Sequence, residues 1–586
     1  MKRNILILVL VLCVLIIFNA MQASACTCFA VGKDASVDGS TFITIQQDTR
    51  SYDPRLFFVP AKDWPEGAMR PCPDYPQYQR WFDEYGNPKN ADEIYEAYDR
   101  HTPAEGPVEK FEIPQVRHTY AYFHGLFGVM NEHQVSFGMP TLSINDALWN
   151  DNGKLRMTQL TMIAAERART AREAIKIMGE LAEKYGFRGE YTPGKGLGVG
   201  DPNEVWILHM MCAGPFWTPE SGEPGAIWVA QRVPDDEVSV FPNGLMIGEI
   251  DFDDHENFMY SSNVKKVAEE MGWWDPDSDK PFNFMEAYSQ GQPFSWSTRF
   301  RKWRGYQLVK PSLKLPDPVE QLEIEGPNGG VYRYPFSVKP DKKVSVEDLF
   351  QWTRDRMEAT KFDRTKGPLA GPFGDTHRTF GLGLTYNGEK IISPRAISAD
   401  YTQYSEVCQM RSWLPDPIGG IIWWSPGEPA ASFRVPFYAG ITKVPESHAT
   451  GNQYEMEWGK TAYWAVTFVN TFSPVMYKYI MEDVREVQHE IDSKGLAAIP
   501  GIDAAALKLY ETDPDQARTF LTQWCNQFAE DATERYWDLC NYLIVKYHNL
   551  YINKPKVAQT PKIPDEEYWK KIALEYQKEV IGVEFK

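Results

Sequence analysis

The sequence predicts an α+β protein with a mainly helical C-terminal region, and three observations carry this prediction. A turn signal at Asp38-Gly39 separates two strand-like runs, residues 119–250 alternate strand-like runs with a helix, and the pattern from Thr461 onward is mainly helical. The chain has 586 residues, of which 43% are apolar. It is therefore long enough to bury a large core and is neither disordered nor fibrous.

The N-terminal segment, residues 1–25, has the composition of a secretory signal peptide. Lys2 and Arg3 precede an apolar run at 5–18, and small residues at 23–25 form a cleavage site. The run is shorter than the roughly 20 residues that a membrane span needs. We therefore expect an exported protein, periplasmic or extracellular, without stable membrane insertion and with Cys26 as its first mature residue. A lipoprotein signal also ends at a cysteine, so a lipid anchor on Cys26 is the alternative.

The charge balance and the cysteines limit the partners and cofactors. With 61 Lys and Arg against 80 Asp and Glu, the net charge is −19, which argues against nucleic acid as a partner. No HExxH motif or paired CxxC spacing occurs, so neither a metal nor another cofactor is predicted. Six cysteines besides Cys26 remain after cleavage, and they either form disulfides or are small buried residues: Cys28, Cys72, Cys212, Cys408, Cys525 and Cys540.

The hairpin after Cys26 predicts which residues return to it. In an antiparallel hairpin centred between residues 36 and 39, paired positions sum to 73–77, so residues 47–51 lie opposite Cys26. Asp48 is then placed to hold the α-ammonium of Cys26 or to orient its thiol. The alternative for Asp48 is a solvent-exposed residue at the end of a strand.

A free N-terminal cysteine contains both a nucleophile and a base. The α-amine titrates near pH 8 and the thiol near pH 8.5, so the amine can take the proton of the thiol at about neutral pH. The thiolate of Cys26 would attack an amide carbonyl, and the amine would protonate the leaving nitrogen. This chemistry also needs a hydrogen-bond donor for the oxyanion and a group that holds the substrate.

The segment CTCFAVGKDASVDGS at 26–40 resembles the opening of the cysteine dipeptidases related to dipeptidase A, which are N-terminal-nucleophile (Ntn) hydrolases. The resemblance covers most of residues 26–495. Further blocks resemble the family in order: IPQV at 113–116, MNEHQVSFG at 130–138, the helical segment 166–187, DPNEVWI at 201–207, GAIWVAQRVPDDEVS at 225–239, ENFMYSSNV at 256–264 and IGGIIWW at 418–424.

The resemblance implies a four-layer αββα sandwich with Cys26 on an inner strand. We expect the Ntn-hydrolase domain to span 26–460 and the helical C-terminal region, 461–586, to pack on it. Within the first domain, residues 60–115 are rich in Pro, Tyr, Asp and Glu and predict an irregular insertion, either a lid over the site or a surface elaboration. The helical region is expected to break near 496–501 and 512–514.

The resemblance also assigns roles to individual residues. Cys26 matches the nucleophile, and Asp48 matches the acidic residue near its amine. Asn243 occupies the place of an oxyanion-hole asparagine, and Asn131 matches a segment whose backbone supplies the second donor. Arg299 resembles the arginine beside the nucleophile, although Arg301 is close enough in the sequence to be the match instead.

Two positions depart from the family pattern. Ile45 stands where many relatives have an arginine, so that cation is absent or supplied by another residue such as Arg50 or Arg299. Met139 stands where relatives often have a glutamate, which puts the choice of substrate in question.

Two local patterns have no expected part in catalysis. Thr170 and Glu173 form a capping box for an amphipathic helix that Gly186 can end. Glycines at alternate positions in 194–200 are followed by a strand-like run instead of a helix, so they do not predict a phosphate loop. We expect a β-turn there.

Together these features predict an exported cysteine peptidase that hydrolyses small peptides, most simply dipeptides, with Cys26 as the nucleophile and its own amine as the base. The first alternative is an amidase or acylase of the same fold that acts on N-acyl compounds. The second is a non-catalytic surface lipoprotein that is anchored at Cys26 and binds peptide or carbohydrate with its aromatic residues. The sequence does not predict the oligomeric state.

Overall fold

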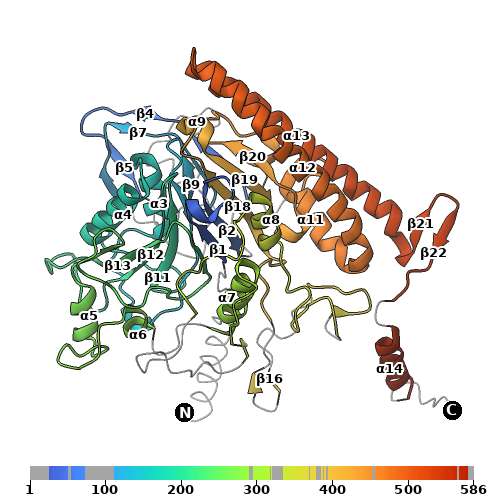
Figure 1. Ribbon diagram of the computed structural model, residues 1–586, viewed down its shortest axis with the longest axis horizontal. Helices are drawn as coiled ribbons and strands as arrows, with labels where there is room; N and C mark the ends of the chain where they lie inside the picture. The colour runs from blue at the N-terminus through green and yellow to red at the C-terminus, as the bar shows by residue number, and fades with distance from the viewer. Residues whose placement is uncertain are drawn as a thin grey trace, which may run out of the picture.

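The computed structural model contains two large antiparallel sheets with helices on their outer sides (Figure 1). The predicted signal peptide and the middle of the predicted insertion, 73–110, lie outside the described residues. The structure describes residues 26–49, 54–72, 111–289, 295–316, 318–319, 334–367, 370–377, 385–386, 389–390, 394–451, 456–563 and 566–578.

The first sheet has six strands and carries the predicted nucleophile at the start of an inner strand. Its order is β14-β1-β2-β18-β19-β20, and every neighbouring pair is antiparallel. The pairing of β2 with β18 joins parts of the chain that are more than 350 residues apart. The bounds are β14 (Val238–Phe241), β1 (Cys28–Val31), β2 (Thr41–Asp48), β18 (Thr402–Met410), β19 (Ile421–Pro426) and β20 (Val435–Tyr438).

The second sheet has eight strands in the order β15-β13-β12-β11-β10-β9-β8-β3. Its pairs are also antiparallel. The bounds are β15 (Phe258–Tyr260), β13 (Ala226–Val233), β12 (Val205–Cys212), β11 (Gly194–Gly200), β10 (Ser136–Gly138), β9 (Gly128–Asn131), β8 (Tyr122–His124) and β3 (Phe57–Val59).

The two sheets pack face to face, and glycines let them approach closely. A Cβ atom at Gly138 would lie 2.9 Å from the Ile43 side chain, and one at Gly198 would lie 2.7 Å from Phe241. The prediction of a β-turn at 194–200 is wrong, because this segment is strand β11. Its alternate glycines leave room for the side chains of the first sheet, which is a reason for glycine inside a strand that the sequence alone does not reveal.

Two helices cover the outer side of the eight-stranded sheet. Helix α3 (Met157–Arg167) contacts β9, and α4 (Ala171–Tyr185) contacts β11, β12 and β13. The predicted boundaries of α4 are confirmed: the Thr170 hydroxyl accepts a hydrogen bond from the Glu173 N–H, and Gly186 follows the helix with φ 79°.

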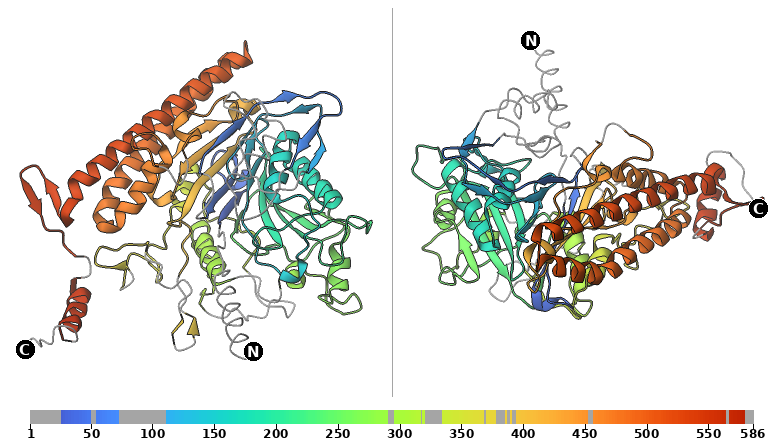
Figure 2. Two further views of the ribbon diagram at one scale, coloured as in Figure 1. Left: turned by 180° about the vertical axis from the view of Figure 1, so that it is seen from behind. Right: turned by 90° about the horizontal axis from the view of Figure 1, so that it is seen from above.

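Helices from distant parts of the chain cover the six-stranded sheet, as Figures 1 and 2 show. Helix α7 (Trp296–Val309) contacts β14, α8 (Val346–Thr353) contacts β18, and α11 (Ala462–Phe472) contacts β19. The antiparallel helices α12 (Tyr477–Tyr510) and α13 (Pro514–Tyr547) contact each other and β20. The interruption predicted at 512–514 is confirmed.

The interruption predicted at 496–501 is wrong, because α12 continues through Pro500. A proline inside a helix removes one hydrogen bond and costs about 3 kcal/mol. Helix α12 packs against α13 and β20, and it has buried residues on both sides of this position, such as Ile499 and Ala506. Such tertiary contacts override the local preference.

The remaining elements are short, and most of them lie around the two large sheets. The hairpin β21/β22 and α14 lie beyond the end of α13, away from both sheets (Figure 2). The bounds of all these remaining elements are β4 (Lys62–Asp63), β5 (Met69–Pro71), β6 (Glu112–Pro114), β7 (His118–Thr119), α5 (Val264–Glu270), α6 (Phe284–Tyr288), β16 (Thr385–Tyr386), β17 (Glu389–Lys390), α9 (Asp416–Gly419), α10 (Glu446–Ala449), β21 (Ile552–Lys554), β22 (Val557–Gln559) and α14 (Glu566–Tyr576).

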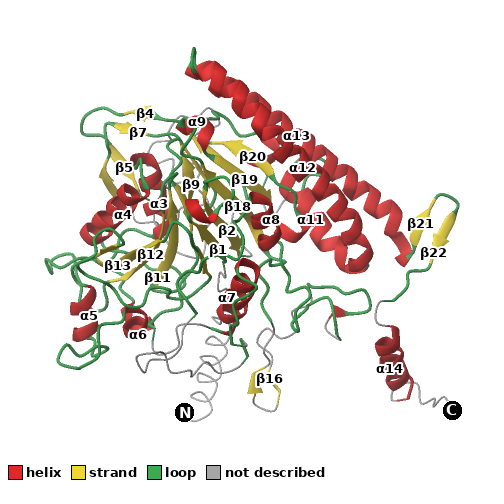
Figure 3. Cartoon of the chain, viewed as in Figure 1, coloured by secondary structure: helices red, strands yellow, loops and turns green. Residues whose placement is uncertain are grey.

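The predicted α+β class is confirmed by the secondary structure, which Figure 3 shows as helices in red and strands in yellow. Among the helices of the described residues, none combines the length and the hydropathy that a membrane crossing requires.

Candidate active site

Cys26 lies two residues before β1, and the hairpin register brings β2 back to it. The pairs Ala30↔Ile43 and Val31↔Phe42 both sum to 73, as does the isolated bridge between Thr27 and Gln46. The predicted register, in which paired positions sum to 73–77, is therefore confirmed. It places Gln47 opposite Cys26, and the thiol sulfur lies 3.8 Å from Gln47 Oε1.

Arg301 on α7 holds the backbone of Cys26. Its Nη1 donates to the Cys26 carbonyl oxygen and, at 3.1 Å, to the hydroxyl of Thr27. Its Nε and Nη2 also donate to Ser297, one turn earlier in the helix. Burial and then the nearby guanidinium of Arg395 lower the pKa of Arg301 to about 10, so it stays charged at neutral pH.

The same guanidinium holds Asn243. Arg301 Nη2 donates to Asn243 Oδ1 at 2.7 Å, and Asn243 Nδ2 donates to the Thr141 carbonyl at 2.6 Å. A guanidinium can only donate and a carbonyl can only accept, so these two contacts fix which end of the amide is nitrogen. The backbone is held as well, because the Thr298 hydroxyl donates to the Asn243 carbonyl at 2.8 Å.

Asp48 is buried at the end of β2 and is not the solvent-exposed residue of the alternative interpretation. Its two carboxylate oxygens lie 2.5 Å from Arg395 Nη2 and from the Thr402 hydroxyl. Burial raises the pKa of Asp48 to about 6, although Arg395, Thr402 and Arg301 act in the opposite direction. The charge of Arg301 interacts with both Asp48 and Cys26.

The cation on Asp48 is therefore Arg395, which the sequence did not single out. Arg50, one residue suggested for this role, lies outside the described residues. Arg299, the other, stacks on the Trp296 ring with its guanidinium carbon 5.2 Å from the ring centre. The arginine that contacts Cys26 is Arg301, the second of the two matches that the resemblance left open.

Asn131 lies at the end of β9, and its described hydrogen bonds hold the turn that follows. Its Nδ2 donates to the carbonyls of Ala165 and Ala168, at 2.9 and 2.7 Å, at the end of α3. Its Oδ1 accepts from the N–H groups of His133 and Val135, both at 3.0 Å. Its own backbone N–H donates to the Val135 carbonyl. None of these contacts goes to Cys26; they hold the turn after β9 against the end of α3.

The next two residues of this turn bind other parts of the fold. Glu132 forms a 2.6 Å ion pair with Arg518 on α13, and His133 lies 2.8 Å from Asp416 at α9. The MNEHQ block thus connects the eight-stranded sheet to the C-terminal helices.

Thr141 and Lys195 were not predicted as site residues, although Thr141 lies in the segment that departs from the family. The Lys195 ammonium donates to the Thr141 hydroxyl at 2.9 Å, and the two residues form a β-bridge. Only the departure near Met139 pointed to this part of the site.

The six cysteines other than Cys26 are all buried and form no disulfide in the described part of the chain, which fits small core residues. Burial raises the pKa of the Cys28 thiol, which faces Gly138 between the sheets, well above its usual range. In the described part of the chain, no three metal-ligating side chains gather at one place.

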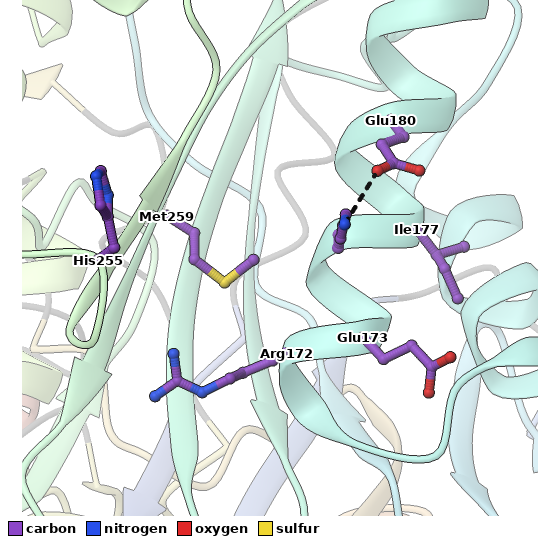
Figure 4. A pocket seen from close by; sticks show the side chains of 7 residues that line it. Arg172, Glu173, Ile177, Glu180, His255 and Met259 are labelled. Atoms are coloured by element: carbon purple, nitrogen blue, oxygen red, sulfur yellow. Dashed lines mark ion pairs between the residues drawn. The ribbon is translucent and has the colours of Figure 1, made fainter.

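A separate hollow lies on the solvent side of α4, between this helix and the segment around Met259 (Figure 4). Arg172 and His255 are among its lining residues. Its charges are paired nearby: Arg172 binds Glu204 at 2.7 Å, and Lys176 lies 3.8 Å from Glu180. The eight-stranded sheet separates this hollow from Cys26, so we assign it no part in the chemistry at Cys26.

Comparisons with known proteins show which family this chain resembles over most of its length. The family model described as "Peptidase family C69" matches residues 25–69 and 120–490. A "Probable dipeptidase" of Latilactobacillus sakei is 25% identical over 542 residues, covering 90% of this chain and 96% of the relative. A "Probable dipeptidase B" of Streptococcus pyogenes serotype M1 is 25% identical over 474 residues, covering 78% and 81%. A "Dipeptidase A" of Lactobacillus helveticus is 23% identical over 501 residues, covering 81% and 89%.

Proposed function

The chain belongs to peptidase family C69, and we propose that it is an exported dipeptidase that attacks the peptide bond with the thiolate of an N-terminal Cys26. The relatives described above are named as dipeptidases, which makes dipeptides the first substrates to test. The proposed fold is the Ntn-hydrolase sandwich, with the layers helix, sheet, sheet and helix.

One observation carries the proposal: a single buried arginine binds both the proposed nucleophile and the proposed oxyanion donor. Arg301 contacts the Cys26 carbonyl and the Asn243 amide oxygen through its two terminal nitrogens. The amide nitrogen of Asn243 is thereby held on the side away from Arg301. Preorganised donors of this kind stabilise the negative charge that develops on a carbonyl oxygen under attack.

The reaction follows from these groups. The α-amine of Cys26 takes the thiol proton, and the thiolate forms a bond to the carbonyl carbon of the substrate while the negative charge moves to its oxygen near Asn243. The carbon–nitrogen bond then breaks, and the ammonium returns the proton to the leaving amine. Water hydrolyses the remaining thioester and regenerates the thiol. In this scheme Asp48 supplies a negative charge and Arg301 a positive charge near the amine.

The first experiment is the intact mass and N-terminal sequence of the mature protein from its native host. A chain that starts with an unmodified Cys26 supports export and the proposed nucleophile. A lipidated Cys26, or a start at another residue, would remove the amine as a base and favour the alternative of a binding lipoprotein.

The second experiment measures hydrolysis of a dipeptide library by the mature protein and its variants. Cys26→Ala is expected to abolish turnover, and one extra residue before Cys26 is expected to do the same because the basic amine becomes an amide. Cys212→Ala, which changes a buried thiol on β12, is the matched control and should stay active. Full activity of Cys26→Ala would contradict the proposal.

The library should include N-acyl amides beside the dipeptides. Turnover of the acyl amides without turnover of dipeptides would replace the proposed reaction with that of an amidase or acylase. Turnover of dipeptides with a free N-terminus and C-terminus is the expected result.

A further inference from the structure

A buried ion pair in the second sheet lies at the start of a chain of contacts that ends at Cys26. Lys195 on β11 and Glu190 in the preceding loop lie 3.2 Å apart, with only 3% and 5% of their side chains exposed. Burying two charges is costly, and such a pair adds little stability compared with apolar residues of similar size.

Lys195 connects the ion pair to the proposed active site. Its ammonium donates to the Thr141 hydroxyl at 2.9 Å, and the Thr141 carbonyl accepts from Asn243 Nδ2 at 2.6 Å. Asn243 Oδ1 then accepts from Arg301, which also binds the Cys26 carbonyl. A continuous series of contacts thus connects the ion pair to Cys26.

Thr141 is the point at which this chain of contacts reaches the amide. Lys195 fixes its side chain, and the β-bridge between the two residues fixes its backbone. The position of the Thr141 carbonyl in turn sets the plane of the Asn243 amide. A displacement of about 1 Å at a group that positions the reacting atoms can lower a rate about 100-fold.

We infer that Lys195 and Glu190 are positioning residues that hold the Asn243 amide, through Thr141, in the orientation needed to stabilise the oxyanion. This inference rests on the proposed function, because it assigns the pair a role in the same reaction. It predicts an effect on the chemical step and little effect on substrate binding, since neither residue needs to touch the substrate.

Lys195→Met removes the ammonium and keeps most of the side-chain volume. We expect kcat to fall about 10- to 100-fold, with KM within about threefold of the wild type. Because this variant leaves Glu190 buried without its cation, the double variant Lys195→Met/Glu190→Gln is measured beside it. Both variants are first checked for folding by circular dichroism and thermal unfolding.

The matched control is another buried ion pair of similar exposure. Arg70 and Glu166 lie 2.7 Å apart, with 3% and 8% of their side chains exposed, and the pair joins β5 to α3. Arg70→Met/Glu166→Gln is expected to lower stability without a selective loss of kcat. An equal loss of kcat in this control would overturn the inference, because it would show a general effect of removing buried charge.

A double-mutant cycle with Asn243→Ala separates positioning from a purely structural role. If Lys195 acts through Asn243, Lys195→Met should change kcat less than about twofold once the amide is gone. An undiminished loss in the Asn243→Ala background would overturn the inference.

A crystal structure of Lys195→Met tests the positioning role independently of whether the protein hydrolyses dipeptides. If the wild-type protein hydrolyses no dipeptide, the proposed function fails, and the inference is then decided by whether the Asn243 amide leaves the Thr141 carbonyl. An amide that stays in place would overturn the inference, and a displaced amide would support it.

Discussion

Arg395 and the fully buried carboxylate of Asp48 form an ion pair of 2.5 Å although the two residues are 347 positions apart in the chain. Ile45 on β2 stands where the family resemblance implies an arginine, and the cation on Asp48 comes from the segment before β18. The carboxylate beside the proposed nucleophile thus keeps a cationic partner, and several expectations for this site follow from that pair.

Arg395→Met should move the acidic limb of activity to higher pH. Arg395 opposes the rise in pKa that burial causes in Asp48, which now lies at about 6. Without the guanidinium the pKa of Asp48 should rise further, so a larger share of the carboxyl is protonated at neutral pH. The pH dependence of kcat/KM measures this shift. Arg354→Met is the control, because Arg354 forms a similar pair with Asp492, at 2.6 Å, and an equal shift there would contradict the prediction.

Asp48 should also make stability depend on pH. Its pKa is about 6 in the folded protein and about 4 in an unfolded chain. The folded state therefore keeps a proton that the unfolded state has already released, and the free energy of unfolding should fall as the pH rises from about 4 to about 6. The two pKa units correspond to about 3 kcal/mol. Unfolding curves of the wild type and Asp48→Asn measure it, and a constant difference between the two across this range would refute the prediction.

Substitution of Arg301 and substitution of Arg299, which both lie on α7, should have very different effects on activity. Arg301→Met removes the contacts with Cys26 and Asn243, so we expect kcat/KM to fall at least about 100-fold. Arg299→Met removes a cation from the face of Trp296 and should keep activity within about threefold. Steady-state kinetics of the two purified variants measure both losses of kcat/KM. A larger loss in Arg299→Met than in Arg301→Met would instead make Arg299 the arginine of the site.

Asn243→Ala should lower kcat about 100- to 1000-fold with a small effect on KM, as the loss of one oxyanion donor does in other hydrolases. Asn145→Ala is a useful control, because the Asn145 side chain accepts from the Ala147 N–H at the start of a short helical turn. An Asn243→Ala variant with wild-type kcat would remove this residue from the catalytic group.

Asn131→Ala should act mainly on stability. The variant loses four hydrogen bonds and leaves the carbonyls of Ala165 and Ala168 without this donor. Each buried polar group left without a partner costs about 1–3 kcal/mol, so the total loss should be at least about 3 kcal/mol. Chemical denaturation measures it. A normal free energy of unfolding together with a large loss of kcat would instead support the role that the family resemblance gives to this segment.

The parts of the fold that the sequence predicts are those that local signals determine. The Asp38-Gly39 turn sets the register of a short hairpin, so the residue opposite Cys26 follows by counting. The cap at Thr170 and the stop at Gly186 are likewise local. The resemblance to cysteine dipeptidases extends over much of the chain and is confirmed by the family model.

The parts that the sequence does not predict depend on contacts between distant segments. Arg395 and Thr402 reach Asp48 only because β18 pairs with β2, and no local pattern specifies that pairing. The glycines of β11 have their reason in the opposite sheet, and Pro500 is accommodated by packing along α12. Lys195 looks like an ordinary lysine between two glycines until its contact with Thr141 is known.

The pairing of β2 with β18 also sets the order in which the protein can mature. Pairings between residues far apart in the sequence form late, because a long loop must close first. Residues 26–400 contain Cys26, Asn243 and Arg301 but not the strand that supplies Thr402 and continues the sheet past β2. A chain that still lacks β18 thus contains Cys26 without all of the contacts that surround Asp48 in the folded protein. We therefore expect the proposed site to be complete only after β18 has paired with β2 and brought Thr402 to Asp48.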